Sequence, residues 1–193
     1  MAVAASDAEL LTAARELFAE RGYAGVELEE IAARAGITRA ELDRRFPAGK
    51  DQLFGAVVVR VSAEAARRVR DAASQADGPL PTLTTGIDAF LDACTAPEVK
   101  RILLLDGPAV LGREVWQAID SDYGPGLLER ALQEAVGAGE LPPQPIPAAA
   151  RVLLGALEEA ALAIACADDS AVAREEMGRT VHRLLKGLRA PLG

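Results

Sequence analysis

The segment that decides the fold is Ile31–Phe46, which reads "IAARAGITRAELDRRF". Two short helical patterns meet at Gly36, and glycine readily adopts the left-handed backbone conformation that a tight corner between helices requires. Ala32, four residues earlier, is small enough to let the second helix cross close to the first. The side chains expected in the small core around this corner are Ile31, Ile37, Leu42 and Phe46. The pattern predicts a helix–turn–helix, a motif whose second helix lies in the major groove of DNA.

The residues before this segment predict a further helix that completes a three-helix head. Ser6 and Glu9 have the spacing of a capping box, and Gly22 stands where the helical pattern stops. The apolar residues that share one face of this helix are Leu10, Ala14, Leu17 and Phe18. Helices are therefore predicted over Ser6–Arg21, Leu28–Ala35 and Arg39–Phe46, with Thr38 as the N-cap of the last.

The rest of the chain predicts a larger helical domain. A long helix is expected from Asp51 to about residue 76, and further helices at about 82–95, 97–106, 108–120, 124–138, 147–167 and 169–189. The breaks between them are expected at "DGPLP" (77–81), "DGP" (106–108) and "PPQPIP" (142–147). No segment shows the alternation of a strand. We therefore predict an all-α chain of about nine to ten helices, with one domain over residues 1–50 and a second over 51–193.

Composition agrees with helices and with an intracellular location. Half of the 193 residues are hydrophobic but only 4% are aromatic, a balance that favours packed helices over sheets. The N-terminal residues lack the pattern of a signal peptide, and no apolar run approaches the ~18–20 residues that cross a bilayer. The two cysteines, Cys94 and Cys166, form no disulfide framework. We expect a soluble, cytoplasmic protein.

The charge of the chain excludes general electrostatic binding to nucleic acid. The formal net charge is −8, and residues 1–54 hold seven basic and ten acidic residues. Any contact with DNA must therefore come from a few basic side chains that lie together.

The second helix of the motif carries such side chains. Arginine is the side chain that best recognises guanine, and it also binds phosphates. Arg39 and Asp43 are four residues apart, so we expect this acid, and Glu41 beside the later arginines, to hold the arginines in position. The residues predicted to contact DNA are Arg34, Thr38, Arg39, Ala40, Glu41, Asp43, Arg44, Arg45 and Lys50. The alternative is a solvated surface of salt-bridged helix.

The stretch "AARELFAERGYAGVELEEIAARAGITRAELDRRFPAGKDQLF" (13–54) resembles the N-terminal domain of the tetracycline-repressor family of transcriptional regulators. The matching residues are Ala14, Leu17, Phe18, Gly22, Tyr23, Ile31, Ala32, Ala35, Gly36, Leu42, Phe46, Lys50 and Leu53. The stretch from Leu103 to Ile146 resembles a C-terminal domain type of actinobacterial members. The resemblance implies a homodimer whose two heads bind a near-palindromic operator, and a helical body whose small-molecule effector releases the DNA. It also implies a phosphate contact for Lys50.

Three positions depart from the family pattern. Val26 and Glu27 stand where a Thr or Ser usually caps the second helix, and Asp43 stands where a Tyr usually contacts a phosphate. "FPAGK" is one residue longer than the usual spacing before Lys50. Val26, Asp43 and the net charge of −3 over residues 1–54 support the alternative function: a helical ligand-binding or protein-interaction module that keeps the fold without specific DNA binding.

The larger domain shows no pattern of an enzyme. It has no HExxH, GxxxxGK[ST] or GxSxG motif, and His182 is the single histidine, so neither catalysis nor a cofactor or metal is expected. Apolar side chains around the expected "DGP" break instead predict an effector pocket between helices. Its candidate residues are Phe90, Cys94, Leu103, Leu104, Val110, Trp116, Tyr123, Leu127 and Glu159; ordinary core packing is the alternative. The scarcity of aromatic residues favours an aliphatic or lactone-like effector.

The last two predicted helices carry apolar and small residues at helical spacing. Two such helices from each subunit can form a four-helix dimer interface. The residues predicted at this interface are Val152, Leu153, Ala156, Leu157, Ala160, Ile164, Val181, Leu184 and Leu185. The alternative is packing within one chain. Taken together, the sequence predicts a dimeric DNA-binding regulator, most simply a repressor.

Overall fold

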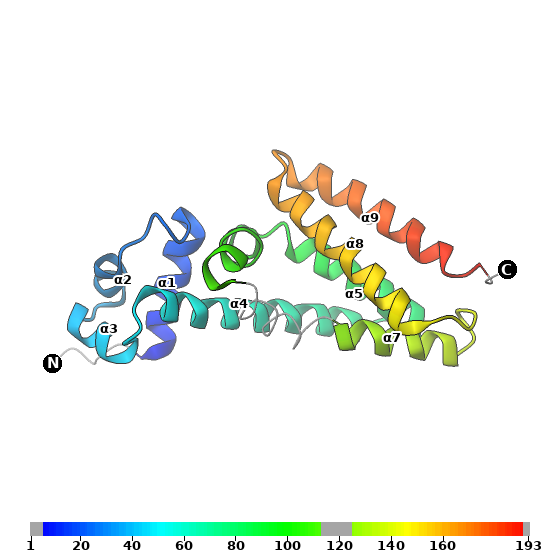
Figure 1. Ribbon diagram of the computed structural model, residues 1–193, viewed down its shortest axis with the longest axis horizontal. Helices are drawn as coiled ribbons and strands as arrows, with labels where there is room; N and C mark the ends of the chain where they lie inside the picture. Colours follow the sequence, from blue (N-terminus) through cyan, green and yellow to red (C-terminus); the bar gives the residue numbers. More distant parts are fainter. Residues whose placement is uncertain (1–5, 113–124, 191–193) are drawn as a thin grey trace. The chain divides into compact units, whose positions relative to one another are not determined.

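The computed structural model describes residues 6–112 and 125–190. All regular secondary structure in these residues is helical, which confirms the all-α prediction (Figure 1). The elements are α1 (Asp7–Arg21), α2 (Leu28–Ala35), α3 (Arg39–Arg45), α4 (Lys50–Ala73), α5 (Pro79–Ala93), η1 (Val99–Asp106), α7 (Pro125–Gly137), α8 (Ile146–Cys166) and α9 (Ser170–Gly187). In this described part of the chain, no helix is both long and apolar enough to cross a membrane.

Two compact units divide the chain. The first contains Met1–Ser62 together with Pro97–Trp116, and the second contains Ala63–Ala96 together with Gln117–Gly193. The boundary expected at residue 50 coincides with the first residue of α4, and the division between the units falls further along this helix. α4 therefore begins in the first unit and ends in the second.

The three-helix head forms around a small core in the first unit. Ile31 and Leu42 are fully buried as predicted, whereas Ile37 and Phe46 are only half-buried. Phe18 of α1 and Phe54 of α4 meet edge to face with their ring centroids 5.1 Å apart. Aromatic pairs of this geometry add to the stabilisation that burial of the rings already provides. The start of α4 is thereby part of the core of the head.

The capping signals of the head have the predicted geometry. The Glu9 carboxylate accepts from the backbone N–H of Ser6 at 2.7 Å, and the Ser6 hydroxyl accepts from the N–H of Glu9 at 3.3 Å. Gly36 adopts the left-handed conformation, with φ 69° and ψ 28°, at the corner between α2 and α3. The predicted turn of the helix–turn–helix is thus confirmed.

The predicted break at "DGP" is wrong. Residues 97–112 are helical throughout, and η1 is a π-helix that leads into Gly107, whose φ of −53° and ψ of −57° are helical. A π-helix forms its hydrogen bonds one residue further along than an α-helix. The chain stays helical through Pro108, although proline donates no N–H.

The second unit is a bundle in which α8 and α9 form a helical hairpin and α5 packs against α7, α8 and α9 (Figure 1). Arg174 of α9 binds α5 through its Nε, 2.7 Å from Asp92 Oδ1, and its Nη2, 3.0 Å from Asp88 Oδ1. After α7, Glu140 accepts from the backbone N–H of Leu80 at 2.7 Å and satisfies a donor in the first turn of α5. These polar contacts join the helices around an apolar interior.

Candidate functional site

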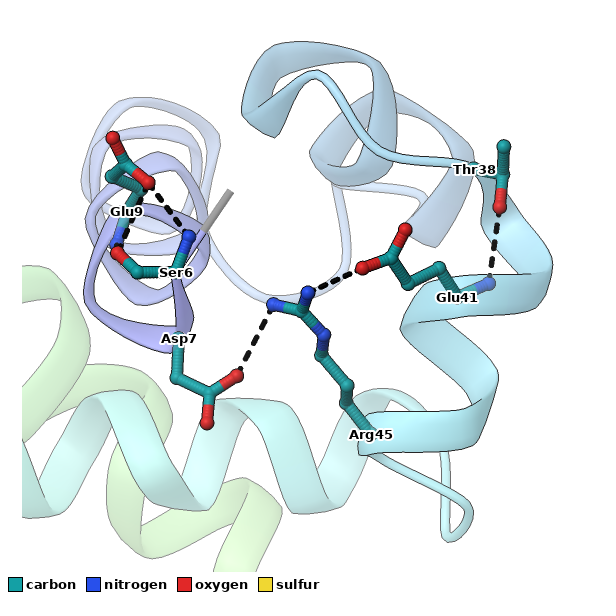
Figure 2. A network of polar contacts seen from close by, with 6 residues as sticks. All are labelled: Ser6, Asp7, Glu9, Thr38, Glu41 and Arg45. Carbon is teal, nitrogen blue, oxygen red and sulfur yellow. Dashed lines mark hydrogen bonds and ion pairs between the residues drawn. The ribbon is translucent and has the colours of Figure 1, made fainter. Parts of the chain in front are cut away.

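α3 presents an outer face of polar side chains above a buried apolar residue. The Thr38 hydroxyl accepts from the N–H of Glu41 at 3.2 Å and caps the helix (Figure 2). Leu42 is fully buried and fixes the inner face of the helix. The predicted DNA-contacting residues that lie exposed on the outer face are Thr38, Ala40, Asp43 and Arg44.

Arg45 lies between two helices of the head. Its guanidinium is 3.2 Å from Asp7 Oδ1 at the N-terminus of α1 and also contacts the Glu41 carboxylate on α3 (Figure 2). Only 20% of its side chain is exposed. The structure therefore places Arg45 where it joins α3 to α1.

Arg39 also has carboxylate partners. Its Nε lies 2.8 Å from Asp43 Oδ1, which confirms the expected pairing at i and i+4, and its Nη1 contacts Glu29 of α2. The hydrogen bond with Asp43 raises the pKa of Arg39 further above neutrality, so the side chain is always charged. Asp43 thus positions Arg39 on the outer face of the head.

Arg34 and Arg44 are the most accessible of the predicted arginines. Arg34 is exposed, with Nη1 3.3 Å from Glu16 Oε2 at the surface. Arg44 is exposed, and within residues 6–112 and 125–190 no acid pairs with it. Among the three arginines of α3, Arg44 is the one whose guanidinium has no carboxylate partner in the described structure.

The additional residue before Lys50 is accommodated by a left-handed glycine. Gly49 has φ 77° and donates its N–H to the Phe46 carbonyl at 2.9 Å, while Gln52 accepts from the N–H of Ala48 at 3.0 Å. Lys50 is then the first residue of α4, with Nζ 4.4 Å from the centre of the Tyr23 ring. This distance is within the range of a cation–π interaction.

Tyr23 joins this basic end of α4 to the rest of the head. Its hydroxyl forms a hydrogen bond with Asp51, the second residue of α4. Burial and, after it, the hydrogen bond and charge of the Asp51 carboxylate together raise the pKa of Tyr23 to about 12. Tyr23 was known from the sequence only as a matching family position, and its partner Asp51 was missed because they are far apart in the chain.

Within the first unit, one end of η1 contacts α1 and the other contacts the turn that follows α1. Arg15 of α1 donates from Nε to Glu98 Oε2 at 3.1 Å, and its Nη2 is 2.6 Å from Glu98 Oε1. At the other end of η1, Asp106 accepts from the backbone N–H of Tyr23 at 2.7 Å. Sequence reasoning missed both contacts, because each joins residues that are 83 positions apart. A segment beyond α5 is in this way part of the same unit as α1, α2 and α3.

The second unit contains a cavity of about 380 Å³ between four helices. Its lining comes from α4 (Val69, Arg70, Ala73), Ser74, α5 (Thr82, Leu83, Gly86, Ile87, Phe90), α7 (Leu127, Leu128, Arg130, Ala131, Glu134) and α8 (Leu154, Leu157, Glu158). The lining is mainly apolar, and its charged side chains are exposed. A concave, mainly apolar space with a few polar groups is the usual form of a small-molecule site.

Two of the residues predicted for the pocket line this cavity. These are Phe90 and Leu127. The others do not line it: Cys94 is buried on α5, Glu159 is exposed on α8, and Leu103, Leu104 and Val110 belong to the first unit, while Trp116 and Tyr123 lie outside the described residues. The expected pocket was centred on the "DGP" break, which the structure does not contain. Since η1 belongs to the first unit, the cavity is built by other helices.

Most of the residues predicted at a dimer interface are buried within the single chain. These are Leu153, Leu157, Ala160, Ile164, Val181 and Leu185, while Ala156 is half-buried. Helices of the same chain cover these side chains. Val152 is 73% exposed and Leu184 50%, and the exposed large apolar side chains of α8 and α9 also include Leu162 and Val172, which the sequence did not identify.

Comparison with known protein families gives two matches to this chain. The family described as "Bacterial regulatory proteins, tetR family" matches residues 10–57, which contain α1 to α3 and the start of α4. The family described as "Tetracyclin repressor-like, C-terminal domain" matches residues 80–188, from α5 to the end of α9. Both compact units are thus represented.

Individual relatives agree with these matches. The chain is 34% identical over 84 residues to the HTH-type transcriptional activator FasR of Mycolicibacterium smegmatis, a match that covers 44% of this chain and 38% of that protein. A TetR-family transcriptional regulator from Pectobacterium atrosepticum has a similar crystal structure, with a TM-score of 0.84 and 29% identity over 96% of this chain and 95% of the other. A structure described as the molecular basis for control of antibiotic production by bacterial hormones has a TM-score of 0.73 and 27% identity, over 95% and 97% of the two chains.

Proposed function

Because this chain belongs to the tetracycline-repressor family of bacterial regulatory proteins, we propose that it is a homodimeric repressor that a small-molecule effector releases from its operator. A DNA-binding domain and a ligand-binding domain are both present in the chain. The direction of regulation, the dimer and the release by an effector are our proposals. The FasR relative is described as an activator, so repression is tested by transcription from an operator-bearing promoter with and without the protein.

The observation that carries the proposal is the outer face of α3. Exposed Thr38 and Arg44 lie above the buried Leu42, and Arg39 is held at the same surface by Asp43 and Glu29. We propose that Arg44 contacts a base edge and that Arg39 contacts bases or phosphates. Bidentate contacts from arginine to guanine are the commonest specific contacts in the major groove.

The position of Lys50 supports an orientation in which the outer face of α3 is turned toward the DNA. It begins α4, where the helix dipole adds positive potential, and the Tyr23 ring lies beside its ammonium group. We propose that this end of α4 contacts a phosphate at the edge of the groove. Such contacts position a protein on DNA without adding sequence specificity.

The test is a filter-binding titration on the intergenic DNA beside the gene, repeated at several salt concentrations. We expect sequence-specific binding. The slope of the logarithm of the affinity against the logarithm of the salt concentration should be shallower than the value of about −10 known for a strongly electrostatic repressor. Affinity that ignores both sequence and salt would refute specific DNA binding. The head would then serve the alternative function, a ligand-binding or protein-interaction module.

For the homodimer, we propose an interface formed by the exposed apolar side chains of α8 and α9. These are Val152, Leu162, Val172 and Leu184. A two-fold interface buries the same patch on both subunits, and two heads about one helical turn apart then meet successive major grooves. Light scattering should give a dimer for the wild type and a monomer for Val152→Glu with Leu184→Glu. Val59→Glu, at an exposed valine of α4, is the control that leaves the dimer intact.

For the effector, we propose the cavity between α4, α5, α7 and α8. α4 lines this cavity with Val69 and Ala73, and the same helix begins in the head with Lys50. A ligand that binds one conformation of α4 more tightly than another shifts the equilibrium between the two conformations. The difference in affinity sets how far this equilibrium, and with it the population of heads that can bind DNA, is shifted. A fluorescence-anisotropy measurement of operator release, made with candidate ligands, tests this part directly.

A further inference from the structure

The chemistry of the cavity lining indicates which class of ligand the second unit binds, an inference that rests on the proposed effector function. The floor of the cavity is apolar and buried: Leu83 and Ile87 of α5, Leu128 of α7 and Leu157 of α8. Phe90 is the one aromatic side chain among the described lining residues. This floor is suited to aliphatic groups and offers little surface for stacking a planar ring system.

Four charged side chains line the rim. Arg70 of α4 and Arg130 of α7 are exposed, and neither forms an ion pair with an acid in the described ranges 6–112 and 125–190. The acids of the rim are Glu134 of α7 and Glu158 of α8, of which Glu158 already interacts with another group of the protein. The rim therefore carries two guanidinium groups and two carboxylates, and its two arginines come from different helices and are not engaged by an acid of the described residues.

Arginine is the side chain best suited to a carboxylate or phosphate at such a position. Its planar guanidinium can donate two parallel hydrogen bonds to either group. Arg70 and Arg130 come from two different helices, so one anionic group that contacts both joins α4 to α7. Such a contact would tie the bound ligand directly to α4.

We infer that the ligand is an amphipathic anion, with an aliphatic body on the apolar floor and one carboxylate or phosphate group at Arg70 and Arg130. A cavity of about 380 Å³ lies toward the small end of the ~300–1,000 Å³ range of small-molecule sites, so the aliphatic body is of moderate length. The anionic group stays at the rim, where water still reaches it. The cost of desolvating a charge is thereby avoided.

The test is calorimetric titration of the full chain with four ligands that share a dodecyl chain, each below its micelle-forming concentration. The anions are dodecanoate and dodecyl phosphate, the neutral ligand is 1-dodecanol, and the cation is dodecyltrimethylammonium. We expect at least one anion to bind about tenfold more tightly than the alcohol, and the cation to bind most weakly. Equal binding of the alcohol and both anions, or tightest binding of the cation, would overturn the inference.

Variants of the rim separate the contribution of its arginines to anion binding from non-specific apolar binding in the cavity. The double variant Arg70→Gln with Arg130→Gln should weaken binding of the anions about tenfold and leave binding of the alcohol unchanged. Arg67→Gln, at an exposed arginine of α4 outside the lining, is the matched control and should change neither affinity. An equal loss for anion and alcohol in the double variant contradicts the inference, once circular dichroism shows that the variant is folded.

Operator release, measured on the same samples, distinguishes failure of this inference from failure of the proposed function. If the anions bind with the expected preference and the DNA stays bound, the ligand class holds and the proposed effector mechanism is refuted. If the alcohol releases the DNA and the anions do not, the ligand class is refuted and the effector mechanism stands.

Discussion

The backbone N–H of Tyr23 donates to the Asp106 carboxylate at 2.7 Å, and Arg101 Nε lies 3.3 Å from the same oxygen. The hydrogen bond joins Tyr23, which follows α1 and its C-cap Gly22, to Asp106, the last residue of η1. Asp106→Ala leaves a partly buried N–H without its acceptor, which should lower the free energy of unfolding by about 1–2 kcal/mol. Asp106→Asn keeps an acceptor oxygen and should cost less. Denaturant unfolding checks both variants, and equal losses would show that the hydrogen bond is not the cause.

Arg44 and Arg45 are neighbours in sequence with different surroundings, and their alanine variants should differ accordingly. Arg44→Ala should weaken operator binding by about 1–3 kcal/mol if Arg44 contacts a base, with no change in thermal stability. Arg45→Ala removes the contacts with Asp7 and Glu41 and should lower the free energy of unfolding by about 1 kcal/mol. Filter binding and thermal melting of both variants check the contrast. The reverse pattern would mean that Arg45, rather than Arg44, is the DNA-contacting residue.

Gly22 and Gly36 both have left-handed φ values, 72° and 69°, but they differ in the space around them. A Cβ at Gly36 would meet no other atom within 4 Å, whereas a Cβ at Gly22 would overlap the guanidinium of Arg101. Gly36→Ala should cost about 1 kcal/mol from backbone conformation alone. Gly22→Ala should cost more, because its φ of 72° and ψ of 170° form a combination that is essentially restricted to glycine. Adding Arg101→Ala to Gly22→Ala should restore little, because the exposed guanidinium can move away from the Cβ. If the two single variants melt together, the additional backbone strain at Gly22 is refuted.

Tyr23 makes the stability of the head depend on alkaline pH. Its pKa is raised to about 12 in the folded chain, while a tyrosine in an unfolded chain ionises near pH ~10. The contribution to stability is therefore complete below pH ~10 and is lost as the pH rises from there toward 12. Titration of phenolate absorbance in a Tyr123→Phe background, which leaves Tyr23 as the one tyrosine, measures this shift. A midpoint near 10 in the folded protein would contradict it.

The two cysteines should differ in reactivity. Cys94 is 1% exposed, and burial raises the pKa of its thiol to about 12, so almost no thiolate is present at neutral pH. Cys166 is exposed at the end of α8. A thiol reagent should therefore modify one cysteine in the native protein and a second only after unfolding. Modification of both at equal rates in the native state would place Cys94 in a more open environment.

Local signals in the sequence were sufficient for most of the fold. The bounds of α2 are those predicted, and Thr38 and Ser6 cap their helices as expected, because capping and helical periodicity depend on residues within one or two turns. The "DGP" prediction was wrong for the same reason. Whether Pro108 ends a helix depends on the hydrogen bonding of the residues before it, and a π-helix is not encoded by any single residue type.

The candidate sites were less accessible to sequence reasoning. Helical spacing identified Leu153, Leu157 and Leu185 as one apolar stripe, but spacing alone does not say whether a stripe packs inside its own chain or on a second copy. The charges of α3 were identified, and the pairing of Arg39 with Asp43 follows from their spacing. The pairing of Arg45 with Asp7 does not, because it depends on how α1 and α3 pack.

η1 also determines the rotational phase of the helix that follows it. A Cβ at Gly55 of α4 would lie 3.7 Å from Leu111, so this leucine points toward α4 in the present register. A turn of π-helix holds more residues than the 3.6 of an α-helix, so if Val99–Asp106 became α-helical, residues 107–112 would rotate about the helix axis. Leu111 would then leave α4 while Glu98 still faced Arg15. The π-helix thus acts as an angular spacer between two contacts with the head.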